Sequence, residues 1–276
     1  MDRWHGCRDS DSPATLSVRD CRCAAQQIAF DLASEEIIEQ RVRSFTTKNA
    51  TREPALKKLF EDAGCAGDAL VEQPVKGSRH PNLICTRQGD RDSTIVVGAH
   101  FDLIEAGSGV VDNWSGASLL ASLYQGLAKS PRVHTFVFVG FTDEEKGLVG
   151  SKAFVKQLGD DASRVKAMIN MDTLGLSETK VWVSHSDPEL VKWIGVAAGT
   201  MKLPVGAVNV DKIGSSDSES FRERRIPAMT IHSLTQDTLS ILHSPRDKFE
   251  ALHPAEYYRS YRLILGFLAI LDQKLD

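Results

Sequence analysis

The sequence has no apolar run long enough to cross a membrane, and it has no excess of basic residues. The longest apolar stretch, residues 263–271, is far shorter than the roughly 20 residues that a transmembrane helix needs. The 33 Lys and Arg residues stand against 37 Asp and Glu residues, which gives a formal net charge of −4. Nucleic-acid binders usually carry a basic surplus. We therefore expect neither a membrane span nor a nucleic-acid partner.

Glycine and proline are also scarce, with 20 and 10 residues among 276, which excludes a collagen-like chain. The apolar share of 42% and the charged share of 25% are ordinary for a globular protein and exclude a disordered tail. Residues 1–24 are polar and without pattern, so we interpret them as an N-terminal arm. No linker or repeat interrupts the remainder, and we expect residues 25–276 to form a single catalytic domain. The N-terminal residues lack the basic and apolar regions of a signal peptide.

Cysteine is the third scarce residue. The five cysteines cannot all pair within one chain, and none of them has the spacing of a zinc-binding CxxC pair. Cys65 and Cys85 flank a predicted strand. They either form a disulfide in an oxidising compartment or remain as two buried thiols, and the sequence leaves both alternatives open.

From about residue 70, short β-branched runs alternate with helical patterns. The predicted strands are 83–86, 94–99, 135–141, 167–171, 180–183 and 228–232. The predicted helices are 115–129, 148–158, 187–199, 217–223 and 255–271, preceded by a helix that opens at Ser34 and another over 55–63. Strands that are apolar throughout are typically buried on both faces. This alternation predicts an α/β fold in which helices cover both faces of a sheet.

Polar residues follow several of these strands. His100 and Asp102 come after the strand 94–99, Glu144 and Glu145 after 135–141, and Asp172 after 167–171. Ligands of α/β sheets bind beyond the carboxyl ends of the strands. We therefore expect these side chains to meet at one edge of the sheet, together with Asp112 from the segment GVVDNWSG and His243 from LHSPRD.

Each of these residues taken alone has an ordinary explanation as a turn former, a helix cap or a surface residue. Two adjacent glutamates after an apolar strand are less ordinary, because buried carboxylates need a cation, a partner or a proton. Asp102 lies two residues after His100 on extended chain, so it can orient that imidazole. Two histidines and three carboxylates suit two zinc ions, with a further glutamate left free to accept a proton. This is the composition of a two-metal hydrolase.

At this point the sequence resembles the M28 family of zinc aminopeptidases over residues 70–276. The matching pieces, in chain order, are AHFD (99–102), VVDNWSGAS (110–118), FTDEEKGLVGS (141–151), NMDTLG (170–175), SSDSESF (215–221) and LHSPRD (242–247). The resemblance implies a three-layer sandwich whose central mixed, mostly parallel sheet has about eight strands. It also implies a metallopeptidase that removes N-terminal residues from peptides with a free N-terminus.

The resemblance implies a role for each polar residue. His100 and Asp172 would hold one zinc ion, Glu145 and His243 the other, and Asp112 both. Glu144 would be the general base and acid, Asp102 would orient His100, and Asp247 would support His243. A cis peptide bond would follow Asp112. Because family members are often exported, we expect a secreted or periplasmic protein with a signal outside this chain, with a cytoplasmic location as the alternative.

Two departures from the family pattern bear on substrate choice. Ser218 stands where many relatives carry His or Tyr, and Leu242 stands where some carry an oxyanion-stabilising Tyr. Two other functions stay open: a single-zinc glutaminyl-peptide cyclotransferase on the same fold, and a non-catalytic binding domain. Gly107 and Gly109 form a GSG loop without the surroundings of a dinucleotide site. Nothing in the sequence indicates an oligomeric state.

Overall fold

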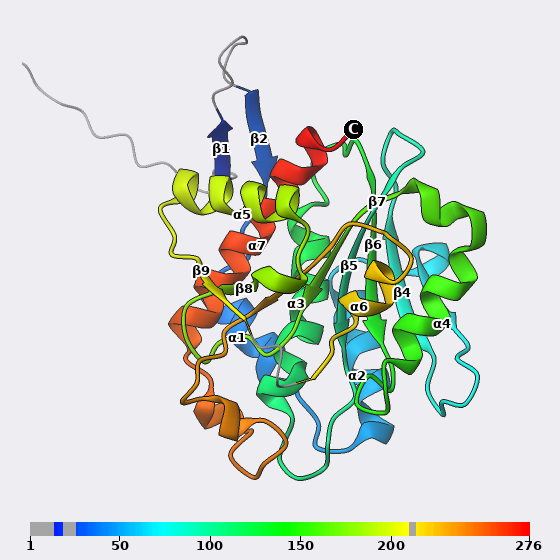
Figure 1. The fold of residues 1–276 in the computed structure, drawn as a ribbon, viewed down its shortest axis with the longest axis vertical. Coiled ribbons are helices and arrows are strands. Elements are labelled where there is room, and N and C mark those ends of the chain that lie inside the picture. The colour runs from blue at the N-terminus through cyan, green and yellow to red at the C-terminus, as the bar shows by residue number, and fades with distance from the viewer. Residues whose placement is uncertain (1–13, 19–25, 210–213) are drawn as a thin grey trace, which may run out of the picture.

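The structure is a computed structural model that describes residues 14–18, 26–209 and 214–276 (Figure 1). Its centre is one eight-stranded sheet in the order β3-β4-β6-β5-β7-β10-β8-β9. The strands are β3 (Leu70–Gln73), β4 (Asn82–Arg87), β5 (Thr94–His100), β6 (Thr135–Phe141), β7 (Val165–Met171), β8 (Lys180–Trp182), β9 (Gly206–Val208) and β10 (Ala228–His232). This mixed sheet confirms the predicted α/β fold and its strand number.

The four middle strands, β6, β5, β7 and β10, run parallel to one another. Antiparallel strands lie outside them, because β4 pairs with β6, and β8 with β10, in the opposite direction. In register, His100 lies opposite Phe141, and Ile231 lies opposite Met171. The carboxyl ends of the parallel strands therefore meet at one edge of the sheet, where the predicted site residues follow them.

Helices cover both faces of this sheet, which gives the expected three layers (Figure 1). The helices are α1 (Glu35–Arg43), α2 (Asn49–Asp62), α3 (Ser115–Gly126), α4 (Val149–Leu158), α5 (Pro188–Met201), α6 (Ser218–Arg222) and α7 (Pro254–Lys274). Helices α3 and α7 belong to the larger core, together with α1, α2 and α5, whereas α4 and α6 pack on the other face. The longest apolar stretch lies inside α7 and is buried. Among the described residues, no helix has both the length and the apolarity of a membrane span.

The N-terminal region holds a hairpin that the sequence did not suggest. Strand β1 (Ala14–Val18) pairs antiparallel with β2 (Gln26–Phe30). Within the expected N-terminal arm over 1–24, residues 14–18 thus form a strand, and the other residues of that arm lie outside the described residues. Ile28 and Phe30 of β2 are buried in the main core.

Three elements differ from the sequence prediction. Helix α2 begins at Asn49, before the expected Ala55, and it contains Pro54 in its interior. Proline lacks the N–H that an interior helical position uses, so it suggested a helix start there. The strands β3 and β9 were missed because they are short and lie at the edges of the sheet, where exposed side chains such as Val71 leave no apolar pattern.

A disulfide joins Cys65 to Cys85, with a Cα–Cα distance of 6.2 Å. Cys65 follows α2, and Cys85 lies in β4. The bond thus ties α2 to an outer strand of the sheet, and it decides between the two alternatives that the sequence left open.

Candidate metal centre

Three of the parallel strands deliver polar side chains to the same edge. His100 is the last residue of β5, and Asp172 directly follows β7. Glu144 and Glu145 lie in the turn after β6, where Asp143 adopts a positive φ of 50°. The apolar residues of these strands are buried. The residues at and just after the strand ends therefore supply the polar side chains that face the cavity.

The bridging candidate, Asp112, lies in an irregular helical turn before α3. The turn Val110–Trp114 contains the cis peptide bond Asp112–Asn113 that the family resemblance implied. The Asn113 side chain donates to the carbonyl of Met171 at 2.8 Å and accepts the amide of Thr173 at 3.2 Å. The turn is thereby tied to the end of β7, which fixes Asp112 next to the strand that carries Asp172.

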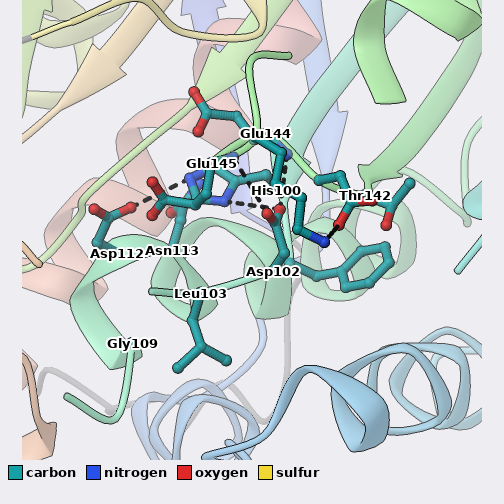
Figure 2. A network of polar contacts seen from close by, with 12 residues as sticks. His100, Asp102, Leu103, Gly109, Asp112, Asn113, Thr142, Glu144 and Glu145 are labelled. Carbon is teal, nitrogen blue, oxygen red and sulfur yellow. Dashed lines mark hydrogen bonds and ion pairs between the residues drawn. The ribbon is translucent and has the colours of Figure 1, made fainter. Parts of the chain in front are cut away.

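Each oxygen of Asp112 faces a different histidine. Oδ1 lies 3.2 Å from His100 Nε2 (Figure 2). Oδ2 lies 3.2 Å from His243 Nε2. His243 Nε2 is also 3.1 Å from Glu145 Oε2, and His100 Nε2 is 3.8 Å from Asp172 Oδ1. The structure therefore brings all five predicted ligands together in two halves that share Asp112.

Asp102 contacts both the imidazole of His100 and the backbone of the two glutamates. Its Oδ1 lies 3.4 Å from His100 Nδ1 and accepts the backbone amide of Glu144 at 3.0 Å. Its Oδ2 accepts the backbone amide of Glu145 at 3.2 Å. A single buried carboxylate therefore lies beside the imidazole after β5 and holds the backbone of the two glutamates after β6 (Figure 2).

The ligand set fits a divalent cation. Ligand atoms of His100, Glu144 and Asp172 lie within 4.8 Å of one another, and so do those of His100, Asp112 and Glu145. Glu145 Oε1 is buried and has no hydrogen-bond partner among the described residues. Histidine nitrogens with carboxylate oxygens are the ligands that zinc accepts in catalytic sites. The arrangement suits zinc better than calcium or magnesium, which prefer oxygen ligands alone.

The electrostatics point the same way. Burial raises the pKa of Glu144 to about 10, and nearby carboxylates, Asp217 foremost, add to the rise. Burial likewise raises the pKa of Glu145 to about 7. Burial opposes the ionisation of Asp112, yet hydrogen bonds from His100 and His243 lower its pKa. Crowded buried carboxylates repel one another, so a cation among them would relieve that repulsion.

These residues line a cavity of about 370 Å³. His243 lies at its accessible side, with 53% of its side chain exposed, whereas His100 is buried. Four apolar residues of one hydrophobic cluster also line the cavity and form its apolar wall: Trp182, Leu234, Leu239 and Leu242. The cavity thus combines a polar, acidic end with a hydrophobic side of the kind that binds an apolar side chain.

Sequence reasoning assigned no role to His232, which also lines the cavity. It is the last residue of β10, and its Nδ1 accepts the amide of Leu234 at 3.1 Å. The rule that strand ends carry the site could have found it. Ser216 also lines the cavity, and its hydroxyl contacts that of Thr230 at 2.8 Å.

Asp247 does not have the role that the resemblance implied. Its carboxylate accepts the backbone amides of Val111 and Asp112, at 2.8 and 3.1 Å. It therefore holds the turn that carries Asp112, and the expectation that it supports His243 is corrected. The reason is the position of the loop 243–247, which passes beside that turn.

The comparisons with known proteins identify the family of this chain. The family model described as "Peptidase family M28" matches residues 82–268. A curated relative from Arthroderma benhamiae, named "Probable leucine aminopeptidase", is 28% identical over 214 residues, 72% of this chain and 60% of its own length. This chain therefore spans less than two thirds of that relative.

Two solved structures share the fold. The LapA aminopeptidase of Legionella pneumophila superposes with a TM-score of 0.77 at 22% identity, over 88% of this chain and 73% of its own. A glutaminyl cyclase of an Acidobacteriales bacterium superposes with a TM-score of 0.70 at 17% identity, over 98% and 99%. The family model covers more than half of the sequence and includes all the strand-end motifs. The chain therefore belongs to peptidase family M28.

Proposed function

We propose that this protein is an aminopeptidase that uses two zinc ions to release N-terminal residues from peptides. The observation that carries the proposal is the position of Asp112, whose two oxygens face His100 and His243 separately. A carboxylate in that position is suited to bridge two metal ions. The names of the curated relatives support the same activity.

The zinc assignment follows the two halves of the site. His100 and Asp172 would hold one ion, Glu145 and His243 the other, and Asp112 would contact both. Zinc bound here would polarise the scissile carbonyl group and lower the pKa of the attacking water. Asp102 keeps the imidazole of His100 oriented for this purpose, since it lies at the far nitrogen of the ring.

Glu144 is the proposed general base and acid. Its backbone is held by Asp102, and its side chain lines the cavity beside the ligands. Glu144 would take a proton from the attacking water and deliver it to the amine of the departing peptide. Burial is the main cause of its raised pKa and the nearby carboxylates add to it, and bound cations would lower this pKa toward the value that a base needs.

The cavity also indicates the substrate. The carboxylates would attract the free α-ammonium group of a peptide, which restricts cleavage to the first residue. The apolar wall around Trp182 and Leu242 would receive an apolar first side chain. We therefore propose peptides that begin with leucine or a similar residue as substrates.

The test combines elemental analysis with two substrates. Purified protein reconstituted with zinc should hold two ions per chain and should release the amine from a leucyl amide. A Glu144→Gln variant should keep the zinc and lose the turnover, whereas Glu189→Gln on the exposed side of α5 should keep both. A protein that binds zinc but turns over neither the leucyl amide nor a peptide would contradict the proposal.

A glutaminyl substrate belongs in the same assay, because the fold is shared with glutaminyl cyclases. One zinc ion per chain with release of ammonia from a glutaminyl peptide would replace the aminopeptidase by a cyclotransferase. Absence of both zinc binding and turnover would leave a non-catalytic binding domain.

We also propose that the protein is exported. The Cys65–Cys85 disulfide supports this, because such bonds persist in oxidising compartments. Fractionation of the producing cells tests it, and a reduced pair in a cytoplasmic fraction would contradict it.

A further inference from the structure

Arg52 in α2 is a fully buried guanidinium group with no carboxylate in salt-bridge contact among the described residues. Burying an uncompensated charge is costly, so its surroundings need an explanation. The group donates only to backbone carbonyls. Nε donates to Thr46, Nη1 to Phe101, and Nη2 to both Ser108 and Gly109, at distances of 2.6–3.0 Å.

The carbonyl groups of Phe101, Ser108 and Gly109 belong to the two segments that carry metal ligands, whereas that of Thr46 precedes α2. Phe101 directly follows His100, and Gly109 directly precedes the turn that carries Asp112. Arg52 therefore joins the end of β5 to the start of that turn through one rigid, planar group. Although burial lowers the pKa of Arg52 to about 10, it remains charged at neutral pH, and Asp247 and Asp102 favour that charge.

Asp247 holds the same segment from its other side. Its carboxylate accepts the amides of Val111 and Asp112, and its backbone carbonyl accepts the amide of Ser108 at 2.7 Å. In the segment 108–112, Arg52 thus binds the first two carbonyl groups, and Asp247 binds three of the amides. Asp247 lies four residues after His243, so the loop that binds the amides of this segment also carries the second histidine.

The GSG sequence of this loop now has a structural explanation. A Cβ at Gly107 would lie 2.4 Å from the carbonyl oxygen of Ser244, and a Cβ at Gly109 would lie 2.8 Å from the Arg52 guanidinium. Gly109 also has a positive φ of 55°. The two glycines therefore let the loop approach Arg52 and the 244–247 loop closely.

We propose that Arg52 and Asp247 form a clamp that positions Asp112 between His100 and His243, and that this clamp sets the zinc affinity of both halves of the site. The proposal rests on the proposed zinc site. Neither residue touches the metal ligand atoms, so both are positioning residues. Loss of outer contacts of this type typically lowers metal affinity by about 10–100-fold.

The chain contains a matched control. Arg132 is also buried and donates to the carbonyls of Leu127 and Ala29, and Asp272 accepts the consecutive amides of Val133 and His134 at 2.9 Å. This second pair binds the backbone in the same way, and its two side chains also form a buried ion pair, with Arg132 Nη1 3.7 Å from Asp272 Oδ2. It lies before β6, at the opposite end of the strand from Glu144, so its loss would disturb the fold without moving the ligands.

The experiment compares Arg52→Lys, Asp247→Asn and their combination with Arg132→Lys and Asp272→Asn. Zinc dissociation constants are measured by competition with a chromophoric chelator, and unfolding temperatures are measured in the chelator alone. We expect at least a tenfold loss of affinity for both zinc ions in each clamp variant. The zinc dissociation constants of the control variants should stay within about twofold of the wild-type values. This should hold even where their unfolding temperatures fall as much as those of the clamp variants.

The double variant adds a second criterion. Because both residues act through one segment, its loss of affinity should be smaller than the product of the two single losses. Clamp variants with wild-type zinc affinity, or with fully multiplicative losses, would overturn the proposal. A wild-type protein that binds no zinc would instead overturn the proposed function, so the two failures are distinguishable.

Discussion

Asp112 and Glu144 are the two side chains on which the proposed chemistry depends most, and their environments differ. Asp112 is buried between two histidines, and its hydrogen bonds with them lower its pKa. Glu144 is buried among carboxylates, so its pKa is raised. Two acids of neighbouring elements are thus pushed in opposite directions, which is typical of sites where one acid binds and the other exchanges a proton.

Glu144→Gln should lower kcat for a leucyl amide by about 10²–10⁴-fold, the usual contribution of general acid–base catalysis. Zinc content should not change, because glutamine has the size of glutamate and the backbone amide of residue 144 can still donate to Asp102. Steady-state kinetics with elemental analysis measures both. Turnover near the wild-type rate would show that another group accepts the proton.

Asp112→Asn should weaken both zinc ions together, because the residue faces the histidines of both halves. Amide groups are poorer metal ligands than carboxylates, so we expect a loss of at least about tenfold for each ion. A zinc titration followed by calorimetry gives the two affinities separately. Loss at one position alone would argue against a bridge.

Among the elements, the four parallel strands have apolar interiors and polar ends. Their buried runs specify the sheet, and the residues that follow them carry the site. Helix α2 contributes from outside the sheet, since it supplies Arg52 and is tied to β4 by the disulfide. The position of α2 relative to the sheet therefore affects both stability and the arrangement of the ligands.

Replacement of Cys65 and Cys85 together by alanine should lower the free energy of unfolding by about 3 kcal/mol, the entropic effect of opening a loop of this length. The sequence separation is 20 residues. Urea unfolding of the variant and the oxidised wild type measures the difference. The Cys7→Ala variant, at a cysteine outside this pair, is the control, and equal stability of double variant and wild type would contradict the prediction.

The molecule as a whole has a small net charge of −4, but its buried ionisable groups are unevenly distributed. Buried acids and histidines are concentrated at one edge of the sheet, where they affect one another's pKa values. The stability of the entire domain therefore depends on the protonation of this edge and on the cations it binds.

The zinc-free protein should become less stable as the pH rises from about 6.5 to 8.5. The folded pKa of His243 is raised to about 9 by its hydrogen bond with Asp112, so its stabilisation is lost as the pH rises. Glu144 acts in the same direction, because its raised pKa makes the folded state hold a proton that the unfolded state releases.

Zinc should reverse this trend, because its ligands must lose protons to bind it. Zinc at about 100 times its dissociation constant should add about 2.7 kcal/mol for each site that it fills. Thermal unfolding at both pH values, in zinc and in chelator, measures the effect. The same pH trend in both samples would contradict the link between zinc and these ligands.

The sequence by itself determined the strands of the sheet interior and the residues that end them. Buried strands need continuous apolar runs, and the motifs after them, such as AHFD and FTDEEK, are local in the chain. The start of helix α2, the hairpin of β1 and β2, and the edge strands were not predicted, because their patterns are weak or interrupted, as at Pro54. Tertiary contacts stabilise these elements more than local preference does.

Only the tertiary structure decided which distant residues act together. The disulfide depended on the approach of Cys65 to Cys85, and no spacing rule could fix that. The contacts of Asp247 with the Asp112 turn join residues that are 135 positions apart. Arg52 gave no signal in the sequence, because a buried arginine is recognised only by the carbonyl groups that surround it. The residues at each strand end follow from the sequence, but the contacts between residues that are distant in the sequence follow from the fold.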